Sequence, residues 1–221
     1  MSNSLLYGLD IETDTAAGGL DPRVARVVAV ALSSGAGETV FTGDEPDVLT
    51  ALDAHLAACP AGVIVTWNGA AFDLPFLVHR ARRAGVVLGL LLRADPAIVR
   101  HHPSSPETPF AYRGRWHHHR HLDAYRAYRR LTDPGTSCGL KAVARSAGLV
   151  PIEVDSAAIH ELPPALLRRY VASDARVTRQ LALRRWREIS AFVDPPAPST
   201  QEPVTPGTEQ EGGSRPPPPT P

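Results

Sequence analysis

Residues 9–13, Leu9-Asp10-Ile11-Glu12-Thr13, close an apolar stretch that begins at Leu5 and is typical of a β-strand. Side chains alternate along a strand, so we expect Asp10 and Glu12 to share one face, about 6.5 to 7 Å apart. The opposite face would carry Tyr7, Leu9 and Ile11. Two acids that point the same way at the end of an apolar strand indicate either a solvated strand end or a site for a cation.

A long helix is predicted from about Pro163 to Phe192, with proline at its first turn, where the missing N–H costs nothing. Asp174 lies in the middle of its apolar face, where an uncompensated carboxylate would be expensive to desolvate. Tyr170 lies one turn earlier, so its hydroxyl and the carboxylate should reach the same space. Asp174 lies about ten residues inside the helix, which argues against an N-cap and leaves partial exposure as the alternative. The other residues of this face are Leu167, Val171, Val177 and Leu181.

A fourth acid, Asp73, follows a predicted strand that ends at Thr66. Taken alone, Asp73 reads as an ordinary first-turn acid that favours the helix dipole. If it converges with Asp10, Glu12 and Asp174, the repulsion among four carboxylates would raise their pKa values or require divalent cations. Ligands that are all oxygen favour the hard ions Mg²⁺ or Mn²⁺ over Zn²⁺.

The remaining segments predict an α/β fold. Strands are expected at residues 5–12, 24–32, 38–42, 62–66 and around 120–122, which are short, apolar or rich in β-formers, and bounded by turns. Helical spacing predicts helices at residues 46–58, 72–84 and 123–131, and Ser137 is expected to cap a short helix ending near Gly148. Residues 85–115 give no clear pattern. Together the segments predict a mixed five-stranded sheet flanked by helices.

The chain has 221 residues, with 23 Lys and Arg against 23 Asp and Glu. Two cysteines are too few for a disulfide framework, no zinc-binding spacing occurs, and no leader or membrane-spanning run is visible. A cytoplasmic protein without a membrane segment is therefore expected, with residues 1–193 forming one domain. Residues 194–221 contain ten prolines and are predicted to be a disordered tail, either a solvated spacer or a ligand for a protein partner with an aromatic groove.

Between Arg100 and Arg130 the chain carries seven Arg and six His against only Glu107 and Asp123. This excess predicts a basic surface that attracts phosphates, although the chain's preference for Arg over Lys, 22 to one, would produce similar crowding without a ligand. The His117–His121 cluster is interpreted as a solvated or phosphate-facing surface, because neighbours on an extended chain alternate sides and cannot easily share a metal ion. Protonation of this cluster below about pH 6.5 is expected to strengthen attraction to nucleic acid.

These residues resemble three ordered motifs of the DEDD 3′–5′ exonuclease superfamily, whose fold is ribonuclease H-like. The first motif resembles Asp10-Ile11-Glu12-Thr13, the second Asn68-x-x-x-Phe72-Asp73, and the third Tyr170-x-x-x-Asp174. The resemblance covers residues 5 to about 190 and is nearest to predicted exonucleases related to the proofreading domain of family B DNA polymerases. It implies the tyrosine subclass, because Arg169 stands where the histidine subclass carries its histidine.

The resemblance implies a two-metal-ion mechanism with Mg²⁺ or Mn²⁺ as cofactor. It implies that Asp10 bridges both ions, that Glu12 and Asp174 complete one site, and that Asp73 helps to hold the other. The ions would lie about 3.5 to 4 Å apart, one activating water and the other stabilising the leaving 3′ oxygen. Products would be 5′-mononucleotides released from the 3′ ends of single-stranded DNA or RNA. The other implied roles are orientation of water by Tyr170, positioning of the terminal nucleotide by Thr13 and Asn68, and packing beneath the motif by Phe72.

Two other functions fit part of the same pattern. A nuclease-dead domain that binds nucleic acid or a protein partner would also suit a basic patch and a Pro-rich tail, but it does not explain the complete set of acids. An endonuclease acting on RNA in hybrids shares the fold and metals but leaves Tyr170 and Asn68 unexplained. Asp123 and Ser137–Ala144 also resemble family features, whereas the His117–His121 cluster does not. The choice between DNA and RNA, and between DNA repair, proofreading in trans and RNA processing, stays open.

Overall fold

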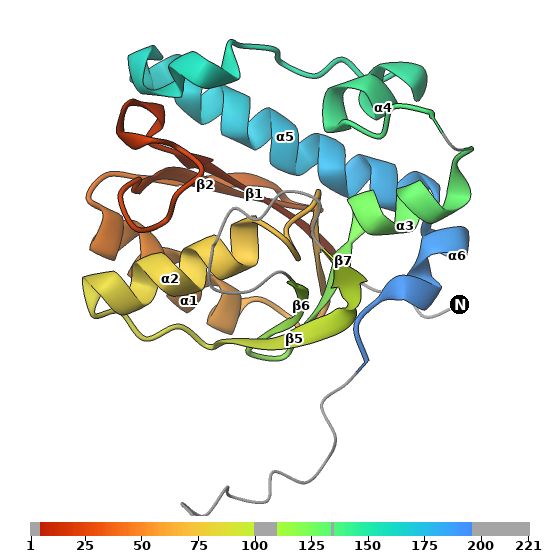
Figure 1. Ribbon diagram of the computed structural model, residues 1–221, viewed down its shortest axis with the longest axis horizontal. Helices are drawn as coiled ribbons and strands as arrows, with labels where there is room; N and C mark the ends of the chain where they lie inside the picture. Colours follow the sequence, from red (N-terminus) through yellow and green to blue (C-terminus); the bar gives the residue numbers. More distant parts are fainter. Residues whose placement is uncertain (1–4, 100–109, 134, 196–221) are drawn as a thin grey trace, which may run out of the picture.

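A seven-stranded mixed sheet forms the centre of the computed structural model, which describes residues 5–99, 110–133 and 135–195 (Figure 1). Strand β1 pairs antiparallel with β2 and parallel with β4, and β4 pairs parallel with β7. A long antiparallel hairpin of β5 and β6 extends the sheet beyond β7. In spatial order the strands are β3 (Gly37–Thr42), β2 (Val27–Ser34), β1 (Leu6–Thr13), β4 (Val63–Thr66), β7 (His119–Asp123), β6 (Phe110–Trp116) and β5 (Leu90–Val99).

Helices cover both faces of this sheet (Figure 1). One face packs against α1 (Glu45–Ala58) and α2 (Asp73–Ala84), and the buried side chains Tyr7, Leu9 and Ile11 of β1 belong to that core. The other face packs against α5 (Pro164–Arg184) together with α3 (Ala124–Leu131), α4 (Leu140–Ser146) and α6 (Trp186–Ile189). Three short 3₁₀ turns complete the elements: η1 (Thr15–Ala17), η2 (Ser156–Glu161) and η3 (Ser190–Phe192).

The mixed α/β architecture was predicted, but the predicted number of five strands is wrong. The two additional strands, β5 and β6, lie, apart from Trp116 at the end of β6, in the stretch from 85 to 115 that gave no clear pattern. Strand β5 is at the edge of the sheet, and edge strands carry charges and proline, here Arg93 and Pro96, that disturb an alternating pattern. Strand β6 contains Arg113, Gly114 and Arg115 in succession, so its sequence also lacks the apolar pattern that predicts a strand.

Two helix boundaries also differ from the expectation. The helix predicted from Pro163 to Phe192 ends at Arg184, because Arg185 leaves helical geometry with φ −114° and ψ 23°. The chain then turns so that Ile189 and Val193 enter the core beside α3. Ser137 does not cap α4; Gly139 occupies the N-cap position, and the indole Nε1 of Trp67 donates to the carbonyl of Cys138 over 3.0 Å.

The prediction of a solvated histidine surface at residues 117–121 is wrong for two of its members, because His119 and His121 are buried. The imidazole Nε2 atoms of His117, His118 and His119 contact the carbonyls of Asp53, Cys59 and Leu56, at 3.2, 2.6 and 2.8 Å, which places them along the C-terminal end of α1. Burial lowers the pKa of His119, which opposes its protonation. Residues 100–109, the other part of the predicted basic surface, lie outside the described residues.

The C-terminal end of the described chain is fixed on β6 and β7. The backbone N–H of Asp194 donates to the carbonyl of His121 over 2.8 Å, and its carboxylate accepts from the N–H of Gly114 over 2.9 Å. The predicted disordered tail from 194 to 221 lies, apart from its first two residues, outside the described residues. Within the described ranges, the helices are too short or too polar to span a lipid bilayer.

Candidate active site

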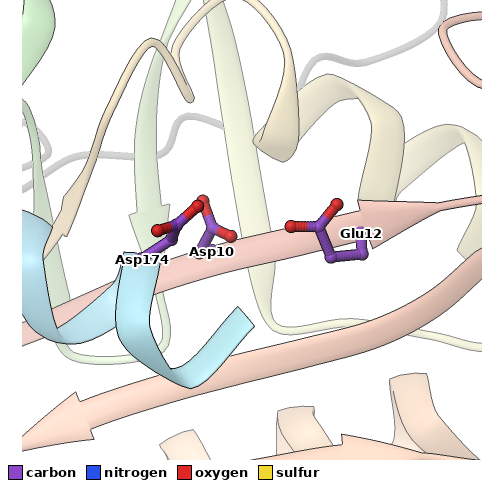
Figure 2. A group of neighbouring side chains, drawn as sticks. All are labelled: Asp10, Glu12 and Asp174. Carbon is purple, nitrogen blue, oxygen red and sulfur yellow. The ribbon is translucent and has the colours of Figure 1, made fainter. Parts of the chain in front are cut away.

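Three carboxylates from two elements meet above the C-terminal half of β1. Asp10 and Glu12 come from β1 and Asp174 from α5, and one oxygen of each lies within 4.8 Å of the others. Figure 2 shows the carboxylates of Asp10 and Asp174 next to each other, with Glu12 farther along the same strand. The structure therefore brings together three of the four acids that the sequence singled out.

Small residues allow α5 to approach the sheet closely enough to place Asp174 there. Gly8 precedes Asp10 on the same face of β1, and a Cβ atom at Gly8 would overlap the backbone carbonyl of Ala175. On the neighbouring strand, Ala31 pairs with Asp10 and Ala29 pairs with Glu12. Both alanines are fully buried against α5. The acids therefore lie next to small residues, Gly8, Ala29 and Ala31, on the face that packs against α5.

Burial and mutual repulsion dominate the electrostatics of this cluster. Burial raises the pKa of Asp10 well above its ordinary value, and the charges of Asp174, Glu12 and Asp73 raise it further. The pKa of Glu12 rises to about 8, again chiefly through burial and then through Asp174. Burial also raises the pKa of Asp174. The folded chain thus holds these carboxylates where their charged forms are unfavourable unless a cation lies nearby.

Asp73 lies near the other three acids but apart from their closest grouping. It is buried at the N-terminus of α2, and its negative charge raises the pKa values of Asp10 and Glu12. Burial raises the pKa of Asp73 to about 7, while hydrogen bonds from the backbone at Asp73 and Ile11 lower it. The backbone of Ile11 can bond to Asp73 because β4 pairs with β1 only from Leu6 to Gly8. The Asp73 carboxylate therefore bonds to β1 where the neighbouring strand has ended.

Lys141 is the cation that the folded chain itself supplies, and sequence reasoning did not single it out. Its ammonium forms an ion pair with Asp174 and lies 4.5 Å from the ring centroid of Tyr170. Tyr170 is buried, and its hydroxyl hydrogen-bonds Asp174. Lys141 lowers the pKa values of Asp10, Glu12 and Asp174. Two signals were available: Lys141 is the only lysine in the chain, and it lies within Ser137–Ala144, the segment that resembles a family feature.

A cavity of about 550 Å³ opens beside Glu12. Thr13 and Phe72 line it, together with residues of the loop after β1 and of η2. The Thr13 side chain is buried and its hydroxyl donates to the carbonyl of Gly19, while the Phe72 ring packs on Phe76 with centroids 5.3 Å apart. Phe72 therefore packs on Phe76, and its ring also forms part of the cavity wall.

Asp123 organises the loop that carries Asn68. Asn68 is exposed and adopts a left-handed backbone with φ 71°. The buried Asp123 carboxylate accepts from the backbone N–H groups of Asn68, Ala70 and Arg126, at 3.1, 3.2 and 3.3 Å. It therefore joins the β4–α2 loop to the start of α3. The sequence marked Asp123 only as a family feature, since bonds to backbone groups about 55 residues away leave no spacing pattern.

The donor set fits a divalent cation. The ligand atoms are carboxylate oxygens, which hard ions such as Mg²⁺ and Mn²⁺ prefer. They are close together, largely buried and mutually repelling, and one of them already contacts an ammonium group. A divalent ion at this cluster would offset the repulsion that raises the carboxyl pKa values.

The arrangement of elements is similar to that of a much longer protein. The structure of the family B DNA polymerase from the hyperthermophilic archaeon Pyrobaculum calidifontis matches this chain with a TM-score of 0.68 and 23% sequence identity. The match covers 83% of this chain and 24% of the polymerase chain, so the chain spans about a quarter of the polymerase's length. At this level of identity the likeness concerns the fold.

The same fold class follows independently from the amino-acid sequence. A family model described as the RNase_H superfamily matches residues 8–161, which begin at Gly8 and include Asp10, Glu12 and Asp73. This span is well over half of the chain and contains all seven strands of the sheet except the first two residues of β1. The predicted ribonuclease H-like fold is confirmed, and the chain belongs to the RNase_H superfamily.

Proposed function

We propose that this chain is a metal-dependent 3′–5′ exonuclease of the DEDD superfamily, tyrosine subclass, which releases 5′-mononucleotides from single-stranded nucleic acid ends. The observation that carries the proposal is the meeting of Asp10, Glu12 and Asp174 within 4.8 Å, with Tyr170 hydrogen-bonded to Asp174. Asp10 and Asp174, from the first and third motifs that resemble this family, are far apart in the sequence, yet their carboxylates meet in the folded chain.

Asp10, Glu12 and Asp174 would hold Mg²⁺ or Mn²⁺, with Asp73 contributing from the N-terminus of α2. Such ions, when bound, activate water and stabilise the oxygen that leaves phosphorus. Tyr170 positions the attacking water through a hydroxyl that is already oriented by Asp174. Burial raises the pKa of Tyr170, so this hydroxyl keeps its proton and acts as a hydrogen-bonding group rather than a base.

The terminal nucleotide would occupy the cavity next to Glu12, whose volume of about 550 Å³ is within the range of small-molecule sites. Thr13 and Phe72 line this cavity, and Asn68 projects from the adjoining loop that Asp123 holds. A single-stranded end can enter such a space, whereas a paired base would first have to be separated from its partner. The proposed substrates are therefore the 3′ ends of single-stranded DNA or RNA.

The test is cleavage of 5′-labelled single-stranded DNA and RNA in Mg²⁺, Mn²⁺ or chelator. We expect stepwise shortening from the 3′ end, lost in chelator and reduced by about 10²- to 10³-fold in Asp10→Ala and Asp174→Ala. Asp47→Ala removes an exposed acid on α1 and serves as the matched control with full activity. Binding without cleavage by the unaltered chain would instead indicate an adaptor, and internal cuts would indicate an endonuclease.

We extend the proposal to the organisation of the chain, with residues 1–193 as the exonuclease domain and the Pro-rich tail as a spacer or a ligand for a protein partner. Asp194 is better kept in any truncated form, because it bonds to Gly114 and His121. A chain ending at residue 195 is expected to keep the nuclease activity and fold of the full chain. Loss of activity in this shortened form would contradict the proposed boundary.

A further inference from the structure

A second cavity, of about 520 Å³, opens at the opposite end of β1 from the carboxylate cluster. It lies where the first residues of β1 meet the turn between β2 and β3, the segment that follows α1, and the last turns of α5. Leu6, in its lining, is six strand residues before Glu12, or about 20 Å along β1. The volume is within the range of small-molecule sites, and the proposed nuclease reaction makes no use of this space.

The walls of this cavity are mainly apolar. Leu5 and Leu183 line it and keep 47% and 46% of their surface exposed, next to the buried Leu6. The hydroxyl of Tyr7, which also lines the cavity, already donates to the carbonyl of Pro60 over 2.8 Å. An apolar ligand body that covered the two exposed leucines would remove their surface from water, which is favourable.

Arg179 is the one permanently charged side chain among the described residues that line the cavity, and that lining contains no Asp or Glu. It is half-buried, and its Nε donates to the carbonyl of Leu6 over 2.9 Å, which fixes the guanidinium beside the start of β1. A guanidinium has five N–H donors, and in the described part of the chain this bond is the only one that Arg179 makes, with no ion pair. Arg176, one turn earlier on α5, instead lies 3.8 Å from the carboxylate of Glu38. A partly desolvated charge without a counter-ion favours the binding of an anion.

Other polar groups of the lining add neither a second charge nor a free hydroxyl at the β2–β3 turn. Burial raises the pKa of Cys59, so its thiol stays protonated and neutral. The Ser34 hydroxyl accepts from the N–H of Ala36 over 3.1 Å and donates to the carbonyl of Gly37 over 3.3 Å. The chemistry of the cavity therefore suits one negative charge on an apolar body. A carboxylate matches the planar fork of a guanidinium through two parallel hydrogen bonds.

We propose that this cavity binds a small amphipathic carboxylate, whose charged group pairs with Arg179 and whose hydrocarbon body lies against Leu5 and Leu183. The proposal is independent of the nuclease reaction, because it uses none of the residues assigned to that reaction. The bound molecule would join the start of β1 to the last turns of α5. It should therefore raise the melting temperature of the chain, as any ligand specific to the folded state does.

The test compares three probes by titration calorimetry on the full chain: octanoate, 1-octanol, which lacks the charge, and inorganic phosphate, which lacks the apolar body. Octanoate should bind at least about tenfold more tightly than either of the others. Arg179→Met should weaken octanoate binding by about tenfold or more, as expected for lost charge-assisted hydrogen bonds, and leave 1-octanol binding unchanged. Arg176→Met removes a charge from the same helix outside the cavity lining and should bind octanoate like the unaltered chain.

Two further measurements locate the bound probe. Leu183→Asp adds a carboxylate to the lining at an exposed position and should weaken octanoate binding by about tenfold, because like charges repel. Leu131→Asp makes the same change at an exposed leucine in the last turn of α3, outside the lining, and should have no such effect. Octanoate should also slow the alkylation of Cys59 by iodoacetamide, with Cys138, which is outside the lining, as the internal reference.

The proposal is wrong if the unaltered chain does not bind octanoate, or if Arg179→Met binds it equally well while its melting temperature shows a folded protein. Equal affinity for 1-octanol would mean that the charge has no role, and equal affinity for phosphate would mean that the apolar walls have none. Either result would overturn the assigned ligand class. A dimer in solution that Leu183→Asp dissociates would show that a second copy of the chain covers the cavity, which would also contradict the proposal.

Discussion

Gly8 and Ala175 set the separation between β1 and α5, because a side chain at Gly8 would collide with the backbone carbonyl of Ala175 and with the Cβ of Arg179. Neither of these groups belongs to a flexible side-chain end that could move aside. The residue after Gly8 on the same face of the strand is Asp10, and the residue before Ala175 is Asp174. The contact between two small residues thus determines whether two acids meet.

Gly8→Ala should therefore damage the candidate site more than the fold. Overpacking of this kind costs about 1 to 3 kcal/mol of stability, and displacement of α5 would separate Asp174 from Asp10. We expect a moderate loss of thermal stability together with a large loss of Mn²⁺ affinity by calorimetry. Gly35→Ala is the control, because a Cβ there meets only the end of Arg179 at 3.6 Å. Unchanged metal affinity in a folded Gly8→Ala variant would contradict this account of the site.

Tyr170→Phe tests the role proposed for the buried hydroxyl. The ring and its contact with Lys141 persist, whereas the hydrogen bond to Asp174 is lost. We expect kcat to fall by about 10- to 100-fold with little change in KM, because the attacking water is less well placed. Tyr128→Phe removes a comparable buried bond, 3.0 Å to the carbonyl of Leu181, and should leave kcat unchanged. Equal effects of the two substitutions would indicate a merely structural role.

The stability of the protein in chelator should fall as pH rises through neutrality. The pKa of Glu12 is about 8 against an ordinary 4.5, and that of Asp73 is about 7 against 3.8. The folded chain therefore binds more protons than the unfolded chain from about pH 4 up to about pH 8, and the free energy of unfolding decreases across this window. Melting curves in chelator at pH 6 and pH 8.5 would measure the decrease.

Two additions make this pH experiment specific to the carboxylate cluster. Glu12→Gln should flatten the dependence, because the neutral amide has no proton to lose. Mg²⁺ at millimolar concentration should raise the melting temperature more at pH 8.5 than at pH 6, since bound cations favour the charged carboxylates. A melting temperature in chelator that rises from pH 6 to pH 8.5 would be the opposite of what the buried acids require.

Asp123→Ala should loosen the loop that precedes α2. The substitution removes the acceptor of three backbone N–H groups, one of which begins α3, at a cost of about 2 to 4 kcal/mol. We expect chemical denaturation to show this loss and cleavage assays to show reduced activity even well below the melting temperature. Asp123→Asn keeps one acceptor oxygen and should lose less. An alanine variant with unaltered stability would contradict the role assigned to Asp123.

Glu45 and Arg80 form a buried ion pair that should be costly to break from one side. Both side chains are 7% exposed, with Arg80 Nη2 2.6 Å from Glu45 Oε2. Glu45 also accepts from the N–H of Val27 over 2.7 Å. Glu45→Gln leaves the guanidinium without its charge partner and should cost about 3 to 5 kcal/mol by urea unfolding. The double variant with Arg80→Met should cost less than the sum of the two single ones.

Three of the four acids of the candidate site could be found in the sequence because each contradicts its local pattern. Asp10 and Glu12 interrupt an apolar strand, and Asp174 interrupts the apolar face of a helix. Such contradictions are visible without knowing the fold. Lys141 and Asp123 contradict nothing locally, since a lysine early in a helix and an aspartate at an N-cap are ordinary, and their partners 33 and 55 residues away appear only in the folded chain.

The elements that could not be predicted are those decided by tertiary packing. Residues 181–189 contain only tolerable helix formers, so nothing local ends α5 at Arg184; burial of Ile189 beside α3 does. Likewise, His119 and His121 read as a polar surface, but they lie on a strand in the middle of the sheet and find partners in Leu56 and Asp194. Hydrogen-bonding partners elsewhere in the chain made burial acceptable for these polar residues.

Strand β4 stops at Thr66, while β1 next to it continues to Thr13. Beyond Gly8, therefore, β1 has no strand partner on the side of β4. The carboxylate of Asp73 and the β4–α2 loop occupy this gap. The loops that border this gap can change in length and sequence without disturbing the pairing of any two strands. A fold built in this way can keep its carboxylate cluster in place while the loops that border the gap change.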